Sequence, residues 1–343
     1  MPDTAGRQAR AVELEALVKR HQDLYYNGQP EISDAEFDAL WDELKGLEPE
    51  NPVLSAVGAD SSGVFRKARH ILPMGSQEKA ANPDEFLSWA KKTGLAEFVV
   101  QDKLDGASVE LQYERGTLTR AVTRGDGIVG DDITANATRM KGVLGKLPTD
   151  FTGAVRGEVV MSKAVHAEHF PDKANCRNAA NGIMKRKDGQ GAEHLDVICY
   201  DAAPKDLYGA DPGSMFQTRP EPPFDDELEK IGWLTSLGFN TVRTELLAEP
   251  YQVIDHRARV VASRAGLPYD IDGLVVKQRI VDPVDMRRAR PELQIAFKFP
   301  LEEAVSTLLD VEWSESGANY TPIGLIEPVR LAGTTVKRAN LAN

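Results

Sequence analysis

The sequence is short of cysteine, of long apolar runs and of positive charge. Among its 343 residues only Cys176 and Cys199 are cysteines, too few for a disulfide framework or a Cys-based zinc finger. No run of about eighteen uncharged apolar residues occurs, which argues against a membrane-spanning helix. The polar segment 1–10 lacks the apolar core of a signal peptide. We therefore expect a cytoplasmic protein without membrane association and without zinc.

Acidic residues outnumber basic ones, with 53 Asp and Glu against 41 Lys and Arg, and the formal net charge is -12. Taken alone, this charge argues against a protein that coats nucleic acid by bulk attraction. The surplus is uneven, because residues 1–60 carry 13 acidic and 5 basic side chains. Basic residues gather at 173–187, 287–290 and 337–338, so local contact with a phosphate backbone stays open.

The chain length predicts more than one domain, and a hydrophobic content of 41% is ordinary for a globular protein. Apolar residues at helical spacing over 14–25 and 37–44 predict two helices, which form a small hairpin. Pro49 and Pro52 are expected to end this unit. Residues 53–75 look irregular and are interpreted as a linker.

From residue 97 the pattern becomes β-like, with helices expected at 83–94 and 225–237. Strands in runs with interspersed helices indicate an α+β fold rather than regular βαβ repeats. From Val311 the chain is again β-like, with too few strands for an independent sheet. The predicted strands of the main domain are 98–100, 108–113, 117–123, 154–161, 195–200, 273–277 and 294–299.

Three short motifs have side chains suited to nucleotide chemistry. The run K-L-D-G at 103–106 offers Lys103 as a nucleophile if its surroundings keep the amine partly neutral, although a charged turn gives the same letters. The glycine-rich segment 124–132 would let backbone approach a phosphate or ribose, or it is an ordinary turn. Glu158 is available to a divalent metal or a sugar hydroxyl, unless it is a paired surface carboxylate.

Lys277 and Lys298 each lie in an apolar strand. Lysine is seldom buried without a partner, so the two suggest an internal anion, and side chains reaching solvent from an edge strand are the alternative. The basic segment 173–187 is either a solvated face or a phosphate contact. His166 and His169 lack a second pair for a metal site, and no P-loop, dinucleotide-binding or hydrolase signature is present.

The order of these motifs resembles the covalent nucleotidyltransferase superfamily of ligases and capping enzymes. K-x-D-G at 103, R-G-D-G at 124, R-G-E at 156, D-G-x-V-x-K at 272 and K-F-P at 298 follow one another as in that superfamily. Segment 25–38 is similar to the nicotinamide-recognition hairpin of bacterial-type NAD-dependent DNA ligases. R-N-A-A at 177, T-P at 321 and L-A-G-T-T-V at 331 also match that family, so the resemblance covers essentially the whole chain.

The resemblance implies an ATP-grasp-like α+β nucleotidyltransferase core of antiparallel sheets with flanking helices. It divides the chain into three parts. Residues 1–68 would be a helical domain that binds the nicotinamide mononucleotide half of NAD. Residues 69–303 would be the adenylation domain, and residues 304–343 the start of an OB-fold.

The resemblance also implies a mechanism. Lys103 would attack the α-phosphorus of NAD, release nicotinamide mononucleotide and keep AMP, which then passes to the 5′-phosphate of a DNA nick for sealing in replication and repair. Lys277, Lys298 and Mg²⁺ would supply a positive field, which would also lower the pKa of Lys103. The expected partners are NAD and nicked double-stranded DNA, and we expect a monomer.

Further roles follow from family position. The expected catalytic residues are Lys103, Asp105, Arg124, Glu158, Lys277 and Lys298, and Glu158 would also hold the metal. Arg177 and Lys185 would contact DNA. The residues expected to bind the cofactor are Tyr25, Asp34, Asp38, Ser76, Gln77, Gln101, Lys103, Arg124, Glu158, Tyr200, Arg264, Asp272, Lys277 and Lys298.

The chain departs from the family pattern at four positions. Gln101 replaces a glutamate that reads the adenine amino group, and its amide oxygen can still accept that hydrogen bond. Tyr26 replaces a histidine and Phe37 a tyrosine, and loss of one hydrogen bond costs about 0.5–1.5 kcal/mol. Lys185 replaces an arginine, so a point charge stands in for a bidentate fork.

The family continues beyond this sequence with the rest of the OB-fold, a zinc finger, helix-hairpin-helix repeats and a BRCT domain. We expect this chain to form the adenylate and to seal nicks weakly or not at all alone, with weak, salt-sensitive DNA binding. Two alternatives stay open. One is an RNA-joining nucleotidyltransferase, and the other is a degenerate homologue that binds nucleotide without reacting.

Overall fold

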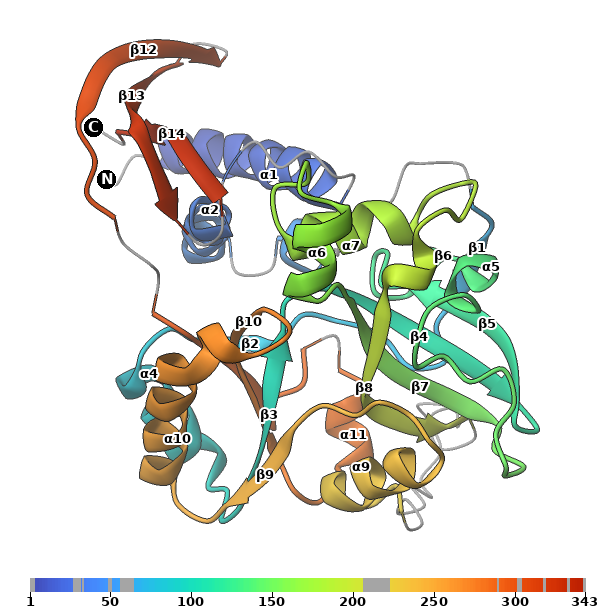
Figure 1. Ribbon diagram of the computed structural model, residues 1–343. Helices are drawn as coiled ribbons and strands as arrows, with labels where there is room; N and C mark the ends of the chain where they lie inside the picture. Colours follow the sequence, from blue (N-terminus) through green and yellow to red (C-terminus); the bar gives the residue numbers. More distant parts are fainter. Residues whose placement is uncertain are drawn as a thin grey trace.

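The computed structural model describes residues 4–26, 32, 34–48, 51–55, 65–205, 223–288, 290–300, 304–316, 319–331 and 334–341. Two larger sheets form the centre of the molecule with helices packed around them, and a three-stranded sheet stands apart (Figure 1). This mixed architecture of helices and mainly antiparallel sheets confirms the predicted α+β fold class. None of the helices in the described ranges is long and apolar enough to span a membrane.

The N-terminal helices pack against each other around a small apolar core. α1 (Thr4–Tyr26) and α2 (Asp34–Leu47) confirm the two predicted helices. The third helix, α3 (Pro52–Ser55), begins at Pro52, which was expected to end the unit. Proline suits the first helical position because the amide hydrogen that it lacks would have no partner there. The buried residues of this core are Ala11, Leu14, Val18, Leu44, Val53 and Leu54.

The five-stranded sheet has the strand order β2-β11-β10-β3-β9. α4 (Pro83–Thr93) and α10 (Pro250–Ser263) cover one face through a core that includes Phe86, Phe98 and Phe297. α4 begins after Asn82, whose side chain accepts from the Glu85 amide, and it ends at a left-handed Gly94, as predicted. The strands are β2 (Glu78–Ala80), β3 (Phe98–Leu104), β9 (Thr244–Leu247), β10 (Ile271–Gln278) and β11 (Gln294–Lys298), all antiparallel to their neighbours except β2 with β11.

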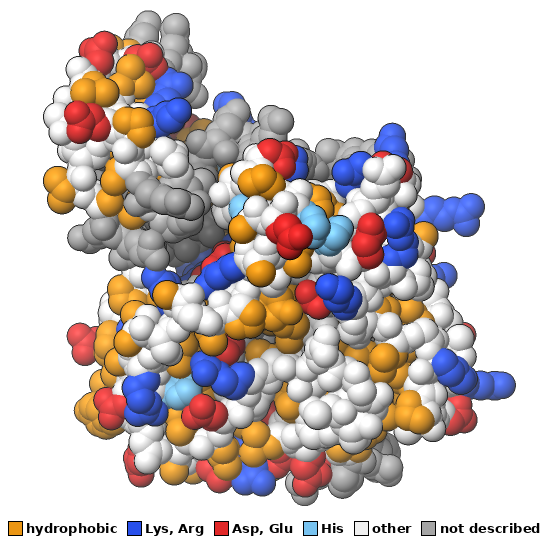
Figure 2. Space-filling view, in the orientation of Figure 1, with side chains coloured by type: hydrophobic (Ala, Val, Ile, Leu, Met, Phe, Trp, Pro, Cys, Tyr) orange, Lys and Arg blue, Asp and Glu red, His pale blue; other side chains and the backbone are white. Residues whose placement is uncertain are grey.

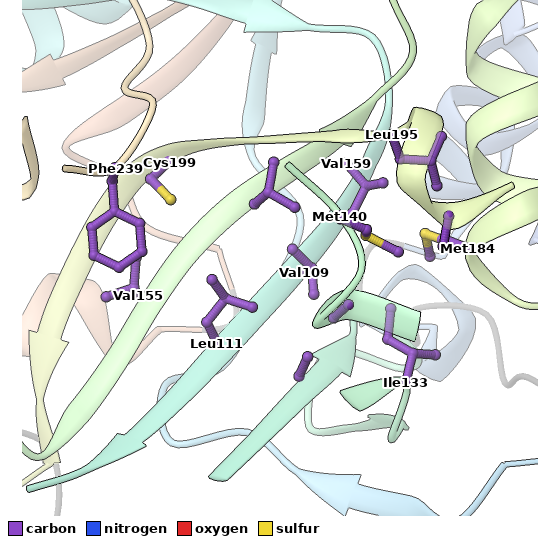
Figure 3. Close-up of a cluster of buried hydrophobic side chains, with 14 of the residues drawn as sticks. Val109, Leu111, Ile133, Met140, Val155, Val159, Met184, Leu195, Cys199 and Phe239 are labelled. Atoms are coloured by element: carbon purple, nitrogen blue, oxygen red, sulfur yellow. The ribbon is translucent and has the colours of Figure 1, made fainter. Parts of the chain in front are cut away.

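The four-stranded sheet is antiparallel in the order β5-β4-β7-β8. Its strands are β4 (Ala107–Glu114), β5 (Thr117–Thr123), β7 (Gly153–Val160) and β8 (Asp196–Pro204). Arg115 and Gly116 join β4 to β5 with φ values of 47° and 69°, which matches a two-residue hairpin turn with both central residues left-handed. The apolar face includes Val109, Leu111, Val155 and Val159 (Figure 3). All seven predicted strands of the main domain are present.

The helices around this sheet are short. α7 (Cys176–Met184) and α9 (Glu227–Ser236) place Ala179 and Leu234 in the same core, and α9 confirms the helix predicted at 225–237. The other helical elements that the structure describes are α5 (Thr134–Ala137), α6 (Lys163–His169), α11 (Pro283–Met286) and the 3₁₀ turns Ala192–His194 and Arg264–Gly266.

The segment before β2 is not a free linker. β1 (Lys67–Arg69) pairs with β6 (Val129–Asp131), and Leu72 and Met74 are buried. The linker prediction is therefore wrong from residue 65 onward, because backbone pairing with a distant loop does not show in local composition. Residues 56–64 lie outside the described ranges.

The C-terminal strands form a separate antiparallel meander of β12 (Leu308–Ser316), β13 (Asn319–Leu331) and β14 (Thr334–Asn340). The sheet stands away from the two larger ones (Figure 1). Leu309 and Trp313 are 61% and 64% exposed, so one side of β12 carries large apolar side chains in contact with solvent. The β character predicted from Val311 onward is confirmed.

Candidate active site

The register of the five-stranded sheet aligns three positions across its centre. Lys103 of β3 is paired with Gly273 of β10, which is paired in turn with Lys298 of β11. Paired residues share a face, so both lysine side chains leave the sheet opposite its aromatic core. A Cβ added at Gly273 would lie 2.7 Å from the Phe297 carbonyl oxygen, so a larger residue would require a backbone shift.

Asp272 holds the two lysines. β10 shifts its register against β3 between Ile271 and Gly273, so Asp272 is the extra residue of a bulge. Its carboxylate oxygens lie 2.7 Å from Lys298 Nζ and 3.2 Å from Lys103 Nζ. Burial by itself would raise the pKa of Asp272, but the Lys103 and Lys298 ammonium groups outweigh it and hold that pKa well below its usual range.

The pKa of Lys103 is raised. Burial favours the neutral amine, but the carboxylates of Asp272, Glu158 and Asp105 outweigh it and hold the pKa above its usual value. The prediction of a lowered pKa and a partly neutral amine is therefore wrong for the protein itself. Lys298 behaves in the opposite way, since burial and the charge of Lys103 lower its pKa.

Glu158 faces this cluster from the four-stranded sheet. It lies on β7 opposite Ser108 of β4, whose hydroxyl donates to the carboxylate at 2.9 Å. Burial raises the pKa of Glu158 to about 7, against the opposing charges of Lys103 and Arg124. The two sheets thus bring side chains from separate motifs into one site.

The donor set of this site fits magnesium only in part. In the ranges that the structure describes, no group of three or more His, Cys, Asp or Glu is arranged to hold a metal ion. Mg²⁺ is commonly bound through one or two carboxylates while phosphate oxygens and waters complete its shell. Glu158, a partly buried carboxylate next to Lys103, fits that mode, in which a phosphate would bring most of the ligands.

The glycine-rich segment 124–132 is a packed turn. Its Asp126 side chain accepts from the Ile128 and Val129 amides, and the Met74 amide donates to the Gly127 carbonyl. The backbone of this segment is therefore paired within the protein, as a turn that leads into β6. Arg124 is the part that reaches the site, where its guanidinium donates at 3.1 Å to the carbonyls of residues 74 and 75 and its charge acts on Glu158.

Tyr200 marks the other end of the site. β8 shifts register against β7 so that Tyr200 is an extra residue, and its carbonyl accepts from Gln101 Nε2 and Lys277 Nζ, each at 3.4 Å. Burial, and next the charge of Glu158, raise the pKa of the Tyr200 hydroxyl. Gln101 also donates to the Thr244 hydroxyl at 3.4 Å, which leaves its amide oxygen pointing away from these two acceptors.

Lys277 is not part of the Lys103 cluster. It lies four residues beyond Gly273 on β10, about 13 Å along the strand at about 3.3 Å per residue. Its Nζ lies 3.2 Å from Glu227 and 3.4 Å from the Tyr200 carbonyl. Lys277 is thus buried and paired, with Glu227 rather than with the Asp272 group, and the prediction that it faces one anion together with Lys298 stays a prediction.

Sequence reasoning missed the charges that pair with Lys277. Lys230 lies 2.7 Å from Glu227 and 2.6 Å from Asp201, and Asp201 lies 3.8 Å from Arg156. A signal was available, because Glu227 and Lys230 have helical spacing with Leu234, which is buried. These positions mark the inward face of α9, where charged residues need partners.

The basic segment 173–187 is partly neutralised by acids. Arg177, at the start of α7, lies 2.8 Å from Asp105, and Arg186 lies 2.9 Å from Asp188. On the face drawn in Figure 2, basic and acidic side chains are interspersed. Arg177 is thus brought to the site through Asp105, while Lys185 lies at the opposite end of α7.

Other predicted cofactor-binding residues have contacts outside the Lys103 cluster. Ser76 Oγ accepts from Arg290 Nε at 3.3 Å, and Gln77 follows it directly before β2. The Arg264 guanidinium carbon lies 5.4 Å over the Phe299 ring. The side chains of Tyr25, Asp34 and Asp38 lie outside the described part of the structure.

Two family models match successive parts of this chain. Residues 62–302 match the NAD-dependent DNA ligase adenylation domain, and residues 4–62 match the DNA ligase-like N-terminal NAD⁺-binding domain. Curated relatives include a DNA ligase of Treponema denticola, 54% identical over 98% of this chain and 53% of its own length. A DNA ligase of Treponema pallidum is 53% identical over 98% of this chain and 41% of its own length.

The chain spans about half the length of the curated relatives it matches. Among solved structures, one named Pmar-Lig_PreS3 aligns with 91% of this chain and 61% of its own, at 14% identity and a TM-score of 0.46.

Proposed function

This chain belongs to the NAD-dependent DNA ligase family, and we propose that it catalyses the first step of ligation, the transfer of AMP from NAD to Lys103. The observation that carries this proposal is the position of Lys103, partly buried between Asp272 and Glu158 with Lys298 beside it. A nucleophilic amine, a cation for the phosphate and a carboxylate on the opposite sheet are the groups that adenylate transfer requires.

In the proposed step, Lys103 Nζ forms a bond to the α-phosphorus as the bond from that phosphorus to its bridging oxygen breaks. Nicotinamide mononucleotide leaves with the bonding electrons, and AMP stays on the amine as a phosphoramidate. The amine must first lose a proton, because only the neutral amine is a nucleophile. Lys298 is placed to stabilise negative charge on the phosphate.

A magnesium ion bound at Glu158 would neutralise phosphate charge during this step. The chain's own contribution is to position the reacting groups. Asp272 orients Lys103 and Lys298 toward each other, and such alignment accounts for much of the rate of phosphoryl transfer. Arg124 and Asp105 lie close enough to act on Glu158 and Lys103, respectively.

The nucleotide would extend from this cluster toward Tyr200 and Gln101, with the adenine ring against Tyr200. The helical domain 1–68, through Tyr25, Asp34 and Asp38, would hold the nicotinamide half. Residues 69–303 would act as the adenylation domain and 304–343 as the start of an OB-fold. Arg177 and Lys185 would contact nicked DNA in later steps that serve replication and repair in the cytoplasm, with the protein acting as a monomer.

The test is covalent labelling. Incubation with NAD labelled in its adenylate should attach AMP to the protein and release nicotinamide mononucleotide. Lys103→Ala should abolish the adduct, whereas Lys141→Ala, which removes an amine outside the Lys103 cluster, should retain it. Absence of label from NAD, label from ATP alone, or an adduct that survives Lys103→Ala would contradict the proposal.

A further inference from the structure

Lys277 is a buried cation to which the proposed adenylate step assigns no role. Its side chain is 8% exposed, and it enters the site at the end lined by Tyr200 and Gln101. A lysine side chain has several rotatable bonds and a compact charge. Its position is therefore set by the groups that hold its ammonium, namely Glu227 and the Tyr200 carbonyl.

Glu227, the first residue of α9, is tied to the end of the strand that carries Lys277. Its amide donates to the Arg279 carbonyl at 2.9 Å, two residues beyond Lys277 on the chain. The preceding Asp226 caps α9 and also lies 2.7 Å from Arg279 Nε. These contacts tie the first turn of α9 to the end of β10, so the Glu227 carboxylate has little freedom to follow a moving lysine.

Glu227 is shared between two ammonium groups. One of its oxygens lies 2.7 Å from Lys230 and the other 3.2 Å from Lys277. Lys230 is 1% exposed and is held on its far side by Asp201 at 2.6 Å. A carboxylate already paired with Lys230 neutralises Lys277 less than an exclusive partner would, so Lys277 keeps charge for a ligand while its direction is fixed.

We propose that Glu227, held by Lys230 and Asp201, is a positioning residue that directs Lys277 toward the bound nucleotide at the Tyr200 end of the site. The inference rests on the proposed function, since NAD is the nucleotide in question. Glu227 itself does not touch the reacting atoms. It acts through Lys277, so it should affect nucleotide binding more than the chemical step at Lys103.

The experiment measures the single-turnover rate of adenylate formation against NAD concentration for Glu227→Gln, which keeps the shape of the side chain and removes its charge. We expect the NAD concentration for half-maximal rate to rise about tenfold, with the maximal rate changed less than about threefold, the pattern of a lost binding interaction. Glu227→Asp keeps the charge but moves it away from Lys277, because the side chain is shorter. Its half-maximal NAD concentration should lie between those of Glu227→Gln and the unmodified protein. Glu97→Gln is the matched control, because Glu97 pairs with Arg279 but is not among the groups that hold Lys277.

A double-mutant cycle separates positioning from a general structural role. If Glu227 acts through Lys277, then in a Lys277→Ala background Glu227→Gln should raise the half-maximal NAD concentration less than twofold. An unchanged half-maximal concentration, a fall in maximal rate alone, or a full additional effect in that background would overturn the inference. If the unmodified protein forms no adduct with NAD, the proposed function has failed instead. Thermal melting of each variant shows that the rates compare folded proteins.

Discussion

Two groups of buried charge lie a few residues apart on β10 and are built differently. At Asp272, one carboxylate faces two ammonium groups, and the side chains of Lys103 and Lys298 are each 26% exposed. At Lys230, two carboxylates face two ammonium groups, and the four side chains are between 1% and 8% exposed. The first group is partly open to solvent and presents two ammonium groups, which suits an anionic substrate. The second is more deeply buried and its charges are closely paired, which suits a fixed support for Lys277.

The largest effect on stability is expected from Lys230→Met in the second group. This change leaves Asp201 and Glu227 buried with one fewer cation, and breaking a buried pair costs about 3–5 kcal/mol. Urea unfolding followed by circular dichroism measures the free energy of unfolding. A loss below about 1 kcal/mol would mean that the cluster is better hydrated than its exposure indicates.

Lys298→Met should lower the rate of adenylate formation strongly and the stability only slightly. The change removes the cation beside Lys103 without leaving Asp272 unpaired, because Lys103 remains 3.2 Å away. We expect adenylate formation to slow about 10²–10³-fold, the usual effect of losing one transition-state charge donor. The melting temperature should change far less than in Lys230→Met. Equal destabilisation in the two variants would remove the distinction between the groups.

The pH dependence of adenylate formation tests the protonation state of Lys103 in the Asp272 group. The pKa of Lys103 is raised, so near neutral pH nearly all of the amine is protonated, and a rise in pH increases the neutral fraction. At NAD concentrations well below saturation, the rate reports the free protein. It should rise about tenfold per pH unit between about pH 7 and pH 9. A flat profile over this range would show that Lys103 is already neutral.

The smallest effect is expected at an exposed pair in the helical hairpin. Arg10 Nε lies 2.7 Å from Glu43, and both side chains are about two-fifths exposed. Solvent screens such a pair, so Glu43→Gln should change the free energy of unfolding by at most about 1 kcal/mol. Urea unfolding at low and high salt measures it. A loss comparable to that of Lys230→Met would mean that exposure does not separate strong from weak pairs in this protein.

Much of the fold could be predicted from the sequence because its signals are local. Alternation over 108–123 located a hairpin, and Asn82 and Gly94 located both ends of α4. The K-x-D-G motif is contiguous as well, and its Lys103 lies near the end of β3. These features depend on neighbours along the chain, and the sequence displays those neighbours directly.

The charge pairing could not be predicted because it depends on register between distant strands. The sequence displays Asp272 and Lys103, but their contact requires that β10 shift by one residue against β3. The raised pKa of Lys103 follows from three carboxylates, one of which comes from the other sheet. The pairing of Lys277 with Glu227 could not be predicted for the same reason, because the two residues are 50 positions apart and on different elements.

The register shift at Tyr200 has a consequence for how this chain can change. Because of the extra residue, Tyr200 and Asp201 avoid strict alternation, and Asp201 pairs with Arg156 on the polar side of β8 while Ala202 enters the apolar core. Deleting one residue here would exchange those two positions and insert a carboxylate among aliphatic side chains. Substitutions at the surface of β8 should therefore be tolerated over time far better than length changes within it. Natural variation in this strand is then expected as replaced side chains at constant spacing.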